Sequence, residues 1–75
     1  MSHQRAEFAL KSGRTLLEQN KLADAVLQLT NATHAEPNLA EAHRLLADAY
    51  TRQGNAADAA VERQQAESLS SPKAQ

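Results

Sequence analysis

The sequence predicts an all-α fold of four helices, arranged as two antiparallel helix-turn-helix units. Apolar residues recur at helical spacing in four stretches, and no stretch is rich enough in Val, Ile or Thr to predict a strand. The chain also repeats itself with a period of 34 residues. At 75 residues it holds one domain with a thin stability margin, and its alanine-rich apolar content of 41% requires closely packed helices.

The repeat appears when residues 6–35 are aligned with residues 40–69. Seven of the thirty aligned pairs are identical, whereas chance would give about 2 to 3 in such an alanine-rich chain. The identical pairs are Ala6/Ala40, Glu7/Glu41, Gln19/Gln53, Ala23/Ala57, Asp24/Asp58, Ala25/Ala59 and Ala32/Ala66. Because they fall at equivalent places in two helical patterns, they predict two copies of one unit.

Within each unit, a short break with turn chemistry separates two helices. Asn20 and Gly54 occupy equivalent positions, and both residue types tolerate the left-handed conformation that ends a helix. Asp24 and Asp58 follow in the first turn of the next helix, where the helix dipole favours negative charge. The sequence therefore predicts helices over residues 4–19, 22–34, 39–52 and 56–69.

Between the units, Pro37 ends the second helix, and Asn38 with Glu41 predicts a capping box at the start of the third. We divide the chain into a leader (1–5), a first unit (6–39), a second unit (40–69) and a tail (70–75) whose composition predicts disorder. The only aromatic residues, Phe8 and Tyr50, fall within the helical patterns and are expected in the core.

Charge and composition argue against several classes of function. Eight Lys and Arg residues and nine Asp and Glu residues are interspersed and leave a net charge of −1, so no basic stripe for nucleic acid or an anionic membrane is expected. The lack of cysteine removes disulfides, thiolate catalysis and Cys-based zinc sites. No apolar run has the length of a signal peptide or a membrane span, and we therefore expect a cytoplasmic protein.

Catalytic and metal-binding patterns are not found in the sequence. Its two glycines, Gly13 and Gly54, have structural roles and form no phosphate-binding loop. His3, His34 and His43 do not share the spacing of metal ligands, and His43 is expected as a partly buried packing residue. We therefore expect no enzymatic activity, no cofactor and no metal.

The period and the small residues at fixed places resemble the tetratricopeptide family, whose signature runs W-x2-L-G-x2-Y, A-x3-F and P. The matching residues are Ala9, Ser12, Gly13, Leu16, Ala25, Leu29 and Pro37 in the first unit, and His43, Leu46, Ala47, Tyr50, Ala59, Arg63 and Ala66 in the second. Small residues at Gly13 and Ala47 let the two helices of a unit approach each other. The resemblance implies a right-handed α/α superhelix, in which the charged Arg63 ends the stack.

The same resemblance implies a protein-interaction module that binds an extended or helical segment of another protein. Its groove would be lined by the first helix of each unit, at Glu7, Leu10, Arg14, Leu17, Glu41, Arg44, Asp48 and Thr51. The alternatives are a self-association domain or a docking segment of a larger enzyme or secretion component. Two units are fewer than the three that repeat arrays usually need, so we expect stability to depend on a homo-oligomer or a partner. An RNA reader is disfavoured by the net acidity and the scarce aromatics.

Overall fold

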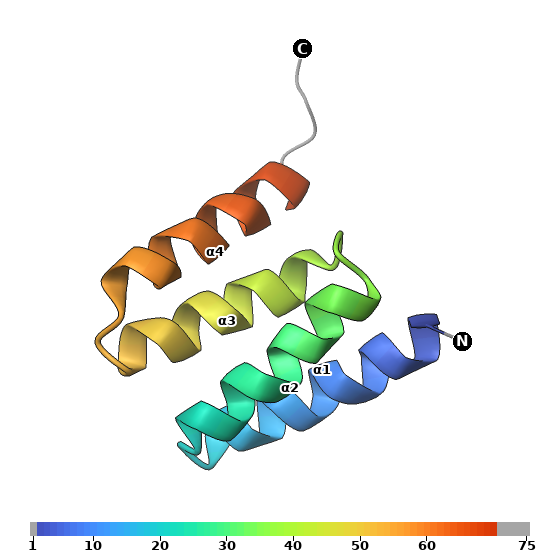
Figure 1. Cartoon of the computed structure of the whole chain (residues 1–75), viewed down its shortest axis with the longest axis horizontal. Coiled ribbons are helices and arrows are strands. Elements are labelled where there is room, and N and C mark those ends of the chain that lie inside the picture. Colours follow the sequence, from blue (N-terminus) through green and yellow to red (C-terminus); the bar gives the residue numbers. More distant parts are fainter. Residues whose placement is uncertain (1, 71–75) are drawn as a thin grey trace.

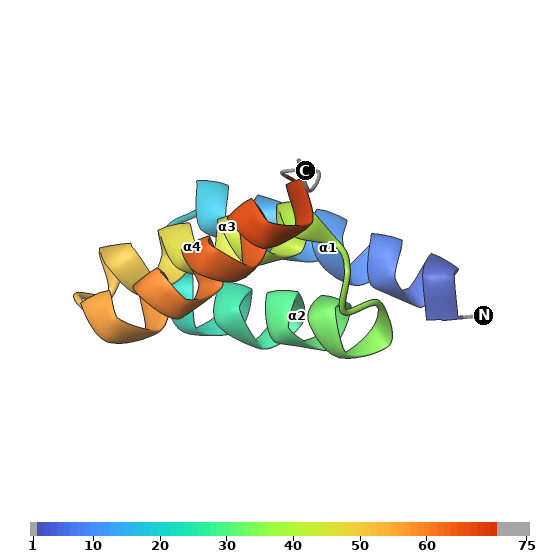
Figure 2. The ribbon, with the colours of Figure 1, turned by 90° about the horizontal axis from the view of Figure 1, so that it is seen from above.

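The fold is all-α, with helix pairs that pack against each other, in a computed structural model that describes residues 2–70 and the side chains of residues 4–70. Its helices are α1 (Ser2–Glu18), α2 (Leu22–Ala35), α3 (Ala40–Arg52) and α4 (Ala56–Ser70). Figure 1 shows α1 paired with α2 and α3 paired with α4, and α2 also packs on α3. Viewed from above, α2 lies in a layer below α1 and α3 (Figure 2).

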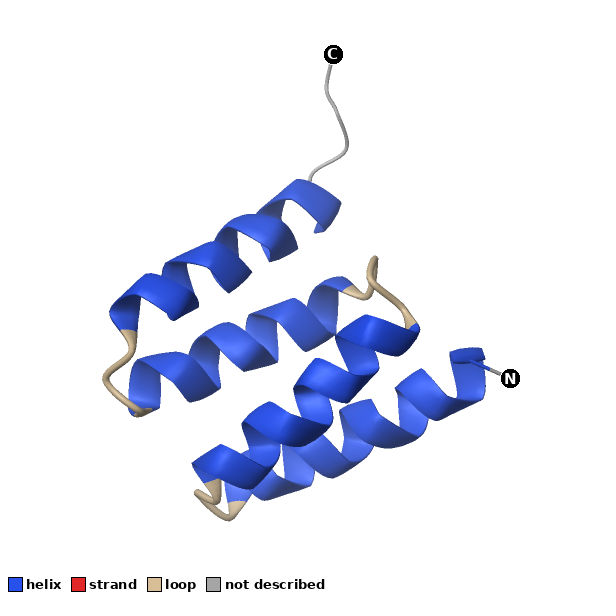
Figure 3. Ribbon diagram, in the orientation of Figure 1, coloured by secondary structure: helices blue, strands red, loops and turns tan. Residues whose placement is uncertain are grey.

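Each predicted helix lies within two residues of its observed bounds, and only short loops separate the helices (Figure 3). Helix α1 begins at Ser2, so it includes most of the segment that we expected as a leader. The predicted disorder of the tail concerns residues 71–75, which lie outside the described residues, whereas Ser70 is the last residue of α4.

The turns inside the two pairs have the same backbone geometry, as the sequence predicted. Asn20 has φ 60° and Gly54 has φ 79°, and both are therefore left-handed. The amide of Lys21 donates to the Leu16 carbonyl at 2.8 Å, and 34 residues later the amide of Asn55 donates to a carbonyl of α3 at 2.8 Å. This six-residue closure is the Schellman ending of a helix. The equivalent positions thus carry the same turn in both pairs.

The junction between the pairs differs from its prediction. The N-cap of α3 is Leu39, and no side chain caps this helix; the capping box of Asn38 and Glu41 was therefore wrong. The carboxylate of Glu41 accepts a hydrogen bond from Arg14 instead. A contact between side chains 27 residues apart has replaced the local one.

Alanine dominates the core: among residues 4–70, nine of the thirteen buried hydrophobic residues are alanines, and the other four are leucines. Leu29 and Leu46 are the largest fully buried side chains. A Cβ atom on Gly13 would lie 2.5 Å from Leu29 Cγ and Cδ2, so only glycine lets α1 and α2 come this close. The expected role of Gly13 is confirmed.

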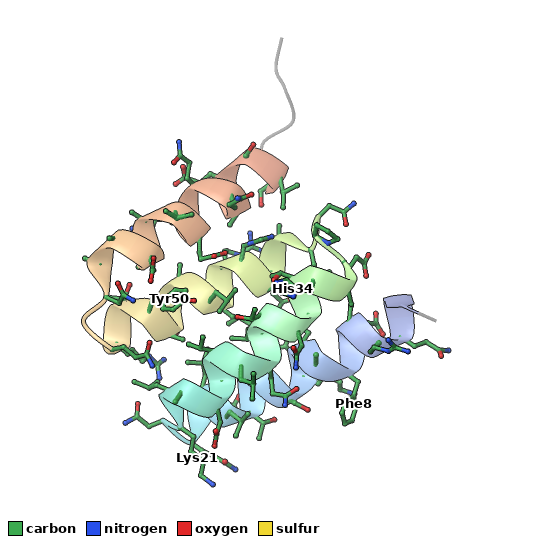
Figure 4. The ribbon with its side chains drawn as sticks, viewed as in Figure 1. Phe8, Lys21, His34 and Tyr50 are labelled. Carbon is green, nitrogen blue, oxygen red and sulfur yellow. The ribbon has the colours of Figure 1, made fainter. Side chains whose placement is uncertain are left out.

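The two aromatic residues differ in burial. Tyr50 is partly buried and packs against the core cluster, as expected. Phe8, in contrast, is 71% exposed, and its predicted core position was wrong. Figure 4 shows the Phe8 ring at the outer edge of α1, pointing away from the other helices. Among the described helices, none covers this face of α1, which is why an apolar pattern did not lead to burial.

Candidate protein-binding surface

The eight residues expected to line the groove differ in their accessibility. Glu7, Arg44 and Thr51 are exposed, and Arg14, Glu41 and Asp48 are half-buried. All six of these residues lie on α1 or α3. Leu10 and Leu17 are the exceptions, because they retain only 9% and 3% of their surface.

Leu10 and Leu17 belong to the hydrophobic core and therefore cannot supply the exposed apolar contacts expected of them. A core this poor in large side chains needs every leucine that faces it. The six other expected groove residues are polar: five carry a charge, and Thr51 carries a hydroxyl group.

Ion pairs tie part of this surface together. Arg14 of α1 pairs with Glu41 of α3 and links the first helices of the two pairs. Asp48 pairs with Arg52 four residues later on the same helix, with nitrogen–oxygen distances of 3.1 and 3.2 Å. Arg52 also donates to the Leu17 carbonyl at 3.1 Å, which provides a second link between α1 and α3.

An open hollow of about 400 Å³ lies where α3 meets α4. It is lined by Arg44, Ala47, Asp48, Thr51 and Arg63. A smaller hollow of about 210 Å³ shares both arginines and continues along the same two helices. The structure thus brings Arg44, Asp48 and Thr51 of α3 together at a hollow that no residue of α1 lines.

Arg63 is a component of this surface that the sequence did not predict. The family resemblance implies only that its charge ends the helical stack, because the pattern has a bulky apolar residue at this position of the second helix. Its guanidinium lies 3.5 Å from the Thr51 hydroxyl of α3. The available signal was the replacement of an apolar residue by arginine, but the sequence did not show the direction in which that arginine points.

His43 is buried, with 8% of its surface exposed, and both of its ring nitrogens have partners. Its Nε2 lies 2.8 Å from the Pro37 carbonyl, to which it must donate, and its Nδ1 lies 2.7 Å from a carboxylate oxygen of Glu62. One further proton is therefore shared between Nδ1 and Glu62. The pair fastens α4 to α3 and confirms the packing role expected for His43.

The other histidines form no site with it. His34 is exposed on α2, and the side chain of His3 lies outside the described ones. Among the described residues, no three or more His, Cys, Asp and Glu side chains form a group that could hold a metal ion.

Near Glu62, burial raises the pKa of the Tyr50 hydroxyl above its ordinary value of 10.0. The carboxylates of Asp58 and Glu62 add to this rise, and a hydrogen bond with Thr30 opposes it. Tyr50 therefore remains neutral where α2, α3 and α4 come together.

Within the described residues, no helix is both long and apolar enough to cross a membrane. No protein-family model matches the chain, and no curated protein matches it either.

Proposed function

We propose that this chain is a non-catalytic protein-interaction module that binds an extended or helical segment of a partner on the face lined by α1 and α3. The proposal rests on the tetratricopeptide-like pattern of the sequence. It is supported by the accessible position of six of the eight expected residues on this face. Five of these six are charged, so charge and hydrogen bonding would dominate recognition.

The strongest support for the proposal is the hollow between Arg44 and Arg63. Arg44 donates to the Ser70 hydroxyl at 3.0 Å, and Arg63 donates weakly to Thr51 at 3.5 Å. Both arginines thus have hydroxyl partners, while the carboxylate of Asp48 is engaged by Arg52. An arginine held only by a neutral hydroxyl can form a stronger, bidentate pair with a carboxylate.

The segment that fits this hollow therefore carries a carboxylate, from an Asp or Glu side chain or from a chain terminus. Arg44 and Arg63 would clamp it from α3 and α4. Arg14 contributes less to recognition, because its guanidinium is already paired with Glu41.

The full chain, used as bait for affinity capture, would identify partners, and the affinity of each would then be measured with single variants. Arg44→Glu and Arg63→Glu should each lower affinity about tenfold or more, because a charged hydrogen bond of about 1.5–3 kcal/mol is lost. Lys21→Glu is the matched control, since it makes the same charge change at an exposed residue of the α1–α2 turn (Figure 4). Unchanged affinity in both arginine variants would refute the proposal that the partner binds at this hollow.

A further inference from the structure

The face of α1 around Phe8 is open and hollowed. Two hollows of about 520 and 380 Å³ adjoin each other there, and Phe8 and Gln28 line both. Ser12 and Leu16 line the larger hollow. Phe8 is the most exposed large hydrophobic residue in the described part of the chain.

By the 34-residue repeat, this face of α1 is equivalent to a face of α3. Phe8, Ser12 and Leu16 are equivalent to three residues of α3, namely Ala42, Leu46 and Tyr50. Those three belong to the core cluster or pack against it, and α2 covers α3. Helix α1 therefore presents the counterpart of a helix-packing face, and no helix in the described part of the chain covers it.

At the opposite end of the molecule, three positions of α4 that would cover this face in a head-to-tail stack are polar. The residues of α4 that are equivalent to Leu29, Thr30 and Thr33 of α2 are Arg63, Gln64 and Glu67, all of them exposed. Head-to-tail stacking of copies would place these polar groups on Phe8. If the face packs instead on the same face of a second copy, Phe8 does not contact these polar groups. Such an assembly contains two copies and cannot grow further.

We propose that α1 is the interface of a homodimer, in which two copies pair antiparallel across a two-fold axis at Ser12. Phe8 and Leu16 lie about one helical turn before and after Ser12. Phe8 of each copy would therefore lie against Leu16 of the other. The small Ser12 side chain at the axis lets the two helices approach closely.

The two cations beside this face, Arg5 and Lys11, lie at different places in the dimer. With the axis at Ser12, the two copies of Arg5 lie about 21 Å apart along the helix direction, well beyond the screening length of about 8 Å at physiological salt. Lys11 lies about 100° around the helix from Ser12. A two-fold axis that relates antiparallel helices leaves both copies of Lys11 on the same flank of the interface, where their exposed side chains repel each other weakly across solvent.

The size of the face predicts a weak dimer. From Arg5 to Leu16 the helix extends about 17 Å, and α1 with α2 is about 20 Å wide. This footprint of about 340 Å² per copy is smaller than the roughly 800 Å² of a standard interface. We therefore expect reversible association in the micromolar range or above, which also adds apolar burial to an alanine-rich core.

Sedimentation velocity of the full chain, from low micromolar to near-millimolar concentration, tests the proposal. We expect a monomer–dimer equilibrium whose dissociation constant rises at least tenfold in Phe8→Glu and is unchanged in Leu27→Glu and Val61→Glu. Leu27 and Val61 are also more than half exposed, but they do not line these two hollows. A monomer at every concentration, a dimer that survives Phe8→Glu, or growth beyond two copies would each overturn it.

A cross-linking experiment tests the position of the axis. Because the chain has no cysteine, Ser12→Cys introduces a single thiol, and we expect it to form a disulfide-linked dimer under mild oxidation. Ser68→Cys on α4 is the control and should stay monomeric. Equal cross-linking of the two variants would contradict an axis at Ser12. Neither residue lines the Arg44–Arg63 hollow, so a failure here leaves the peptide-binding proposal standing.

Discussion

The two helical pairs have the same backbone plan but different side chains at equivalent places. Leu29 is fully buried, whereas its counterpart Arg63 is exposed; Phe8 is exposed, whereas its counterpart Ala42 is buried. The difference follows from the α2–α3 contact, which covers one face of each pair and leaves the others free. Burial in this fold is decided by the neighbouring helix, and the helical spacing alone does not determine it.

The largest expected effect on stability concerns Leu29 and its counterpart Arg63. Leu29→Ala should lower the free energy of unfolding by about 2–5 kcal/mol, because a fully buried leucine leaves a cavity. Arg63→Ala should change it by less than about 0.5 kcal/mol. Urea unfolding followed by far-ultraviolet circular dichroism would measure both. Similar losses in the two variants would show that the pairs do not differ in this way.

Gly13 and Ala47 are also counterparts, but Gly13 faces the fully buried Leu29, whereas the counterpart of Leu29 is the exposed Arg63. Gly13→Ala should cost about 1–3 kcal/mol through overpacking against Leu29, although alanine favours the helix by about 1 kcal/mol. In a Leu29→Ala background the same change should become neutral or stabilising. A double-mutant cycle by urea unfolding measures this coupling, and additive effects would argue against the contact.

In the first helical pair, the counterparts of His43 and Glu62 are Ala9 and Gln28. The double variant His43→Ala/Glu62→Gln therefore places these residues of α1 and α2 at the equivalent positions of α3 and α4. His43→Ala alone should cost about 1–3 kcal/mol, because the Glu62 carboxylate loses its donor. The double variant should cost at least about 0.5 kcal/mol less than the sum of the two single variants. Thermal and urea unfolding of all four proteins would check this, and a coupling of zero would contradict it.

The smallest effect concerns pH. Tyr50 has a raised pKa in the folded chain, so the unfolded chain loses this proton first, at about pH 10. The stability that Tyr50 contributes is therefore present below about pH 10 and is lost as the pH rises from there through the raised pKa. Urea midpoints between about pH 8 and pH 11 should fall more steeply for the wild type than for Tyr50→Phe, and parallel curves would refute the assignment.

Local features of the chain were predictable from the sequence. The turns at Asn20 and Gly54 depend on residues next to each other, and the repeat fixes four helices. Long-range features were not predictable. The spacing of Phe8 marks an apolar face but does not show whether a helix covers it, and the local pattern at Glu41 gives no sign of Arg14, 27 residues away.

The candidate site was predicted only in part, for a related reason. Arg44, Asp48 and Thr51 lie around one hollow, but this hollow is completed by Arg63 of α4 and not by a residue of α1. Leu10 and Leu17 occupy positions that the family resemblance assigns to the groove, but this core has few large side chains and includes both. Core composition is a property of the whole chain, and no single motif reveals it.

The position of α2 between α1 and α3 has a consequence for local unfolding. Helix α2 packs on both of these neighbours, whereas α4 packs on α3 alone. Amide hydrogens of α2 should therefore exchange most slowly and those of α4 fastest, because terminal elements open at the lowest free energy. Since Arg63 lies on α4, a partner bound at the hollow would slow exchange in the helix that opens most readily.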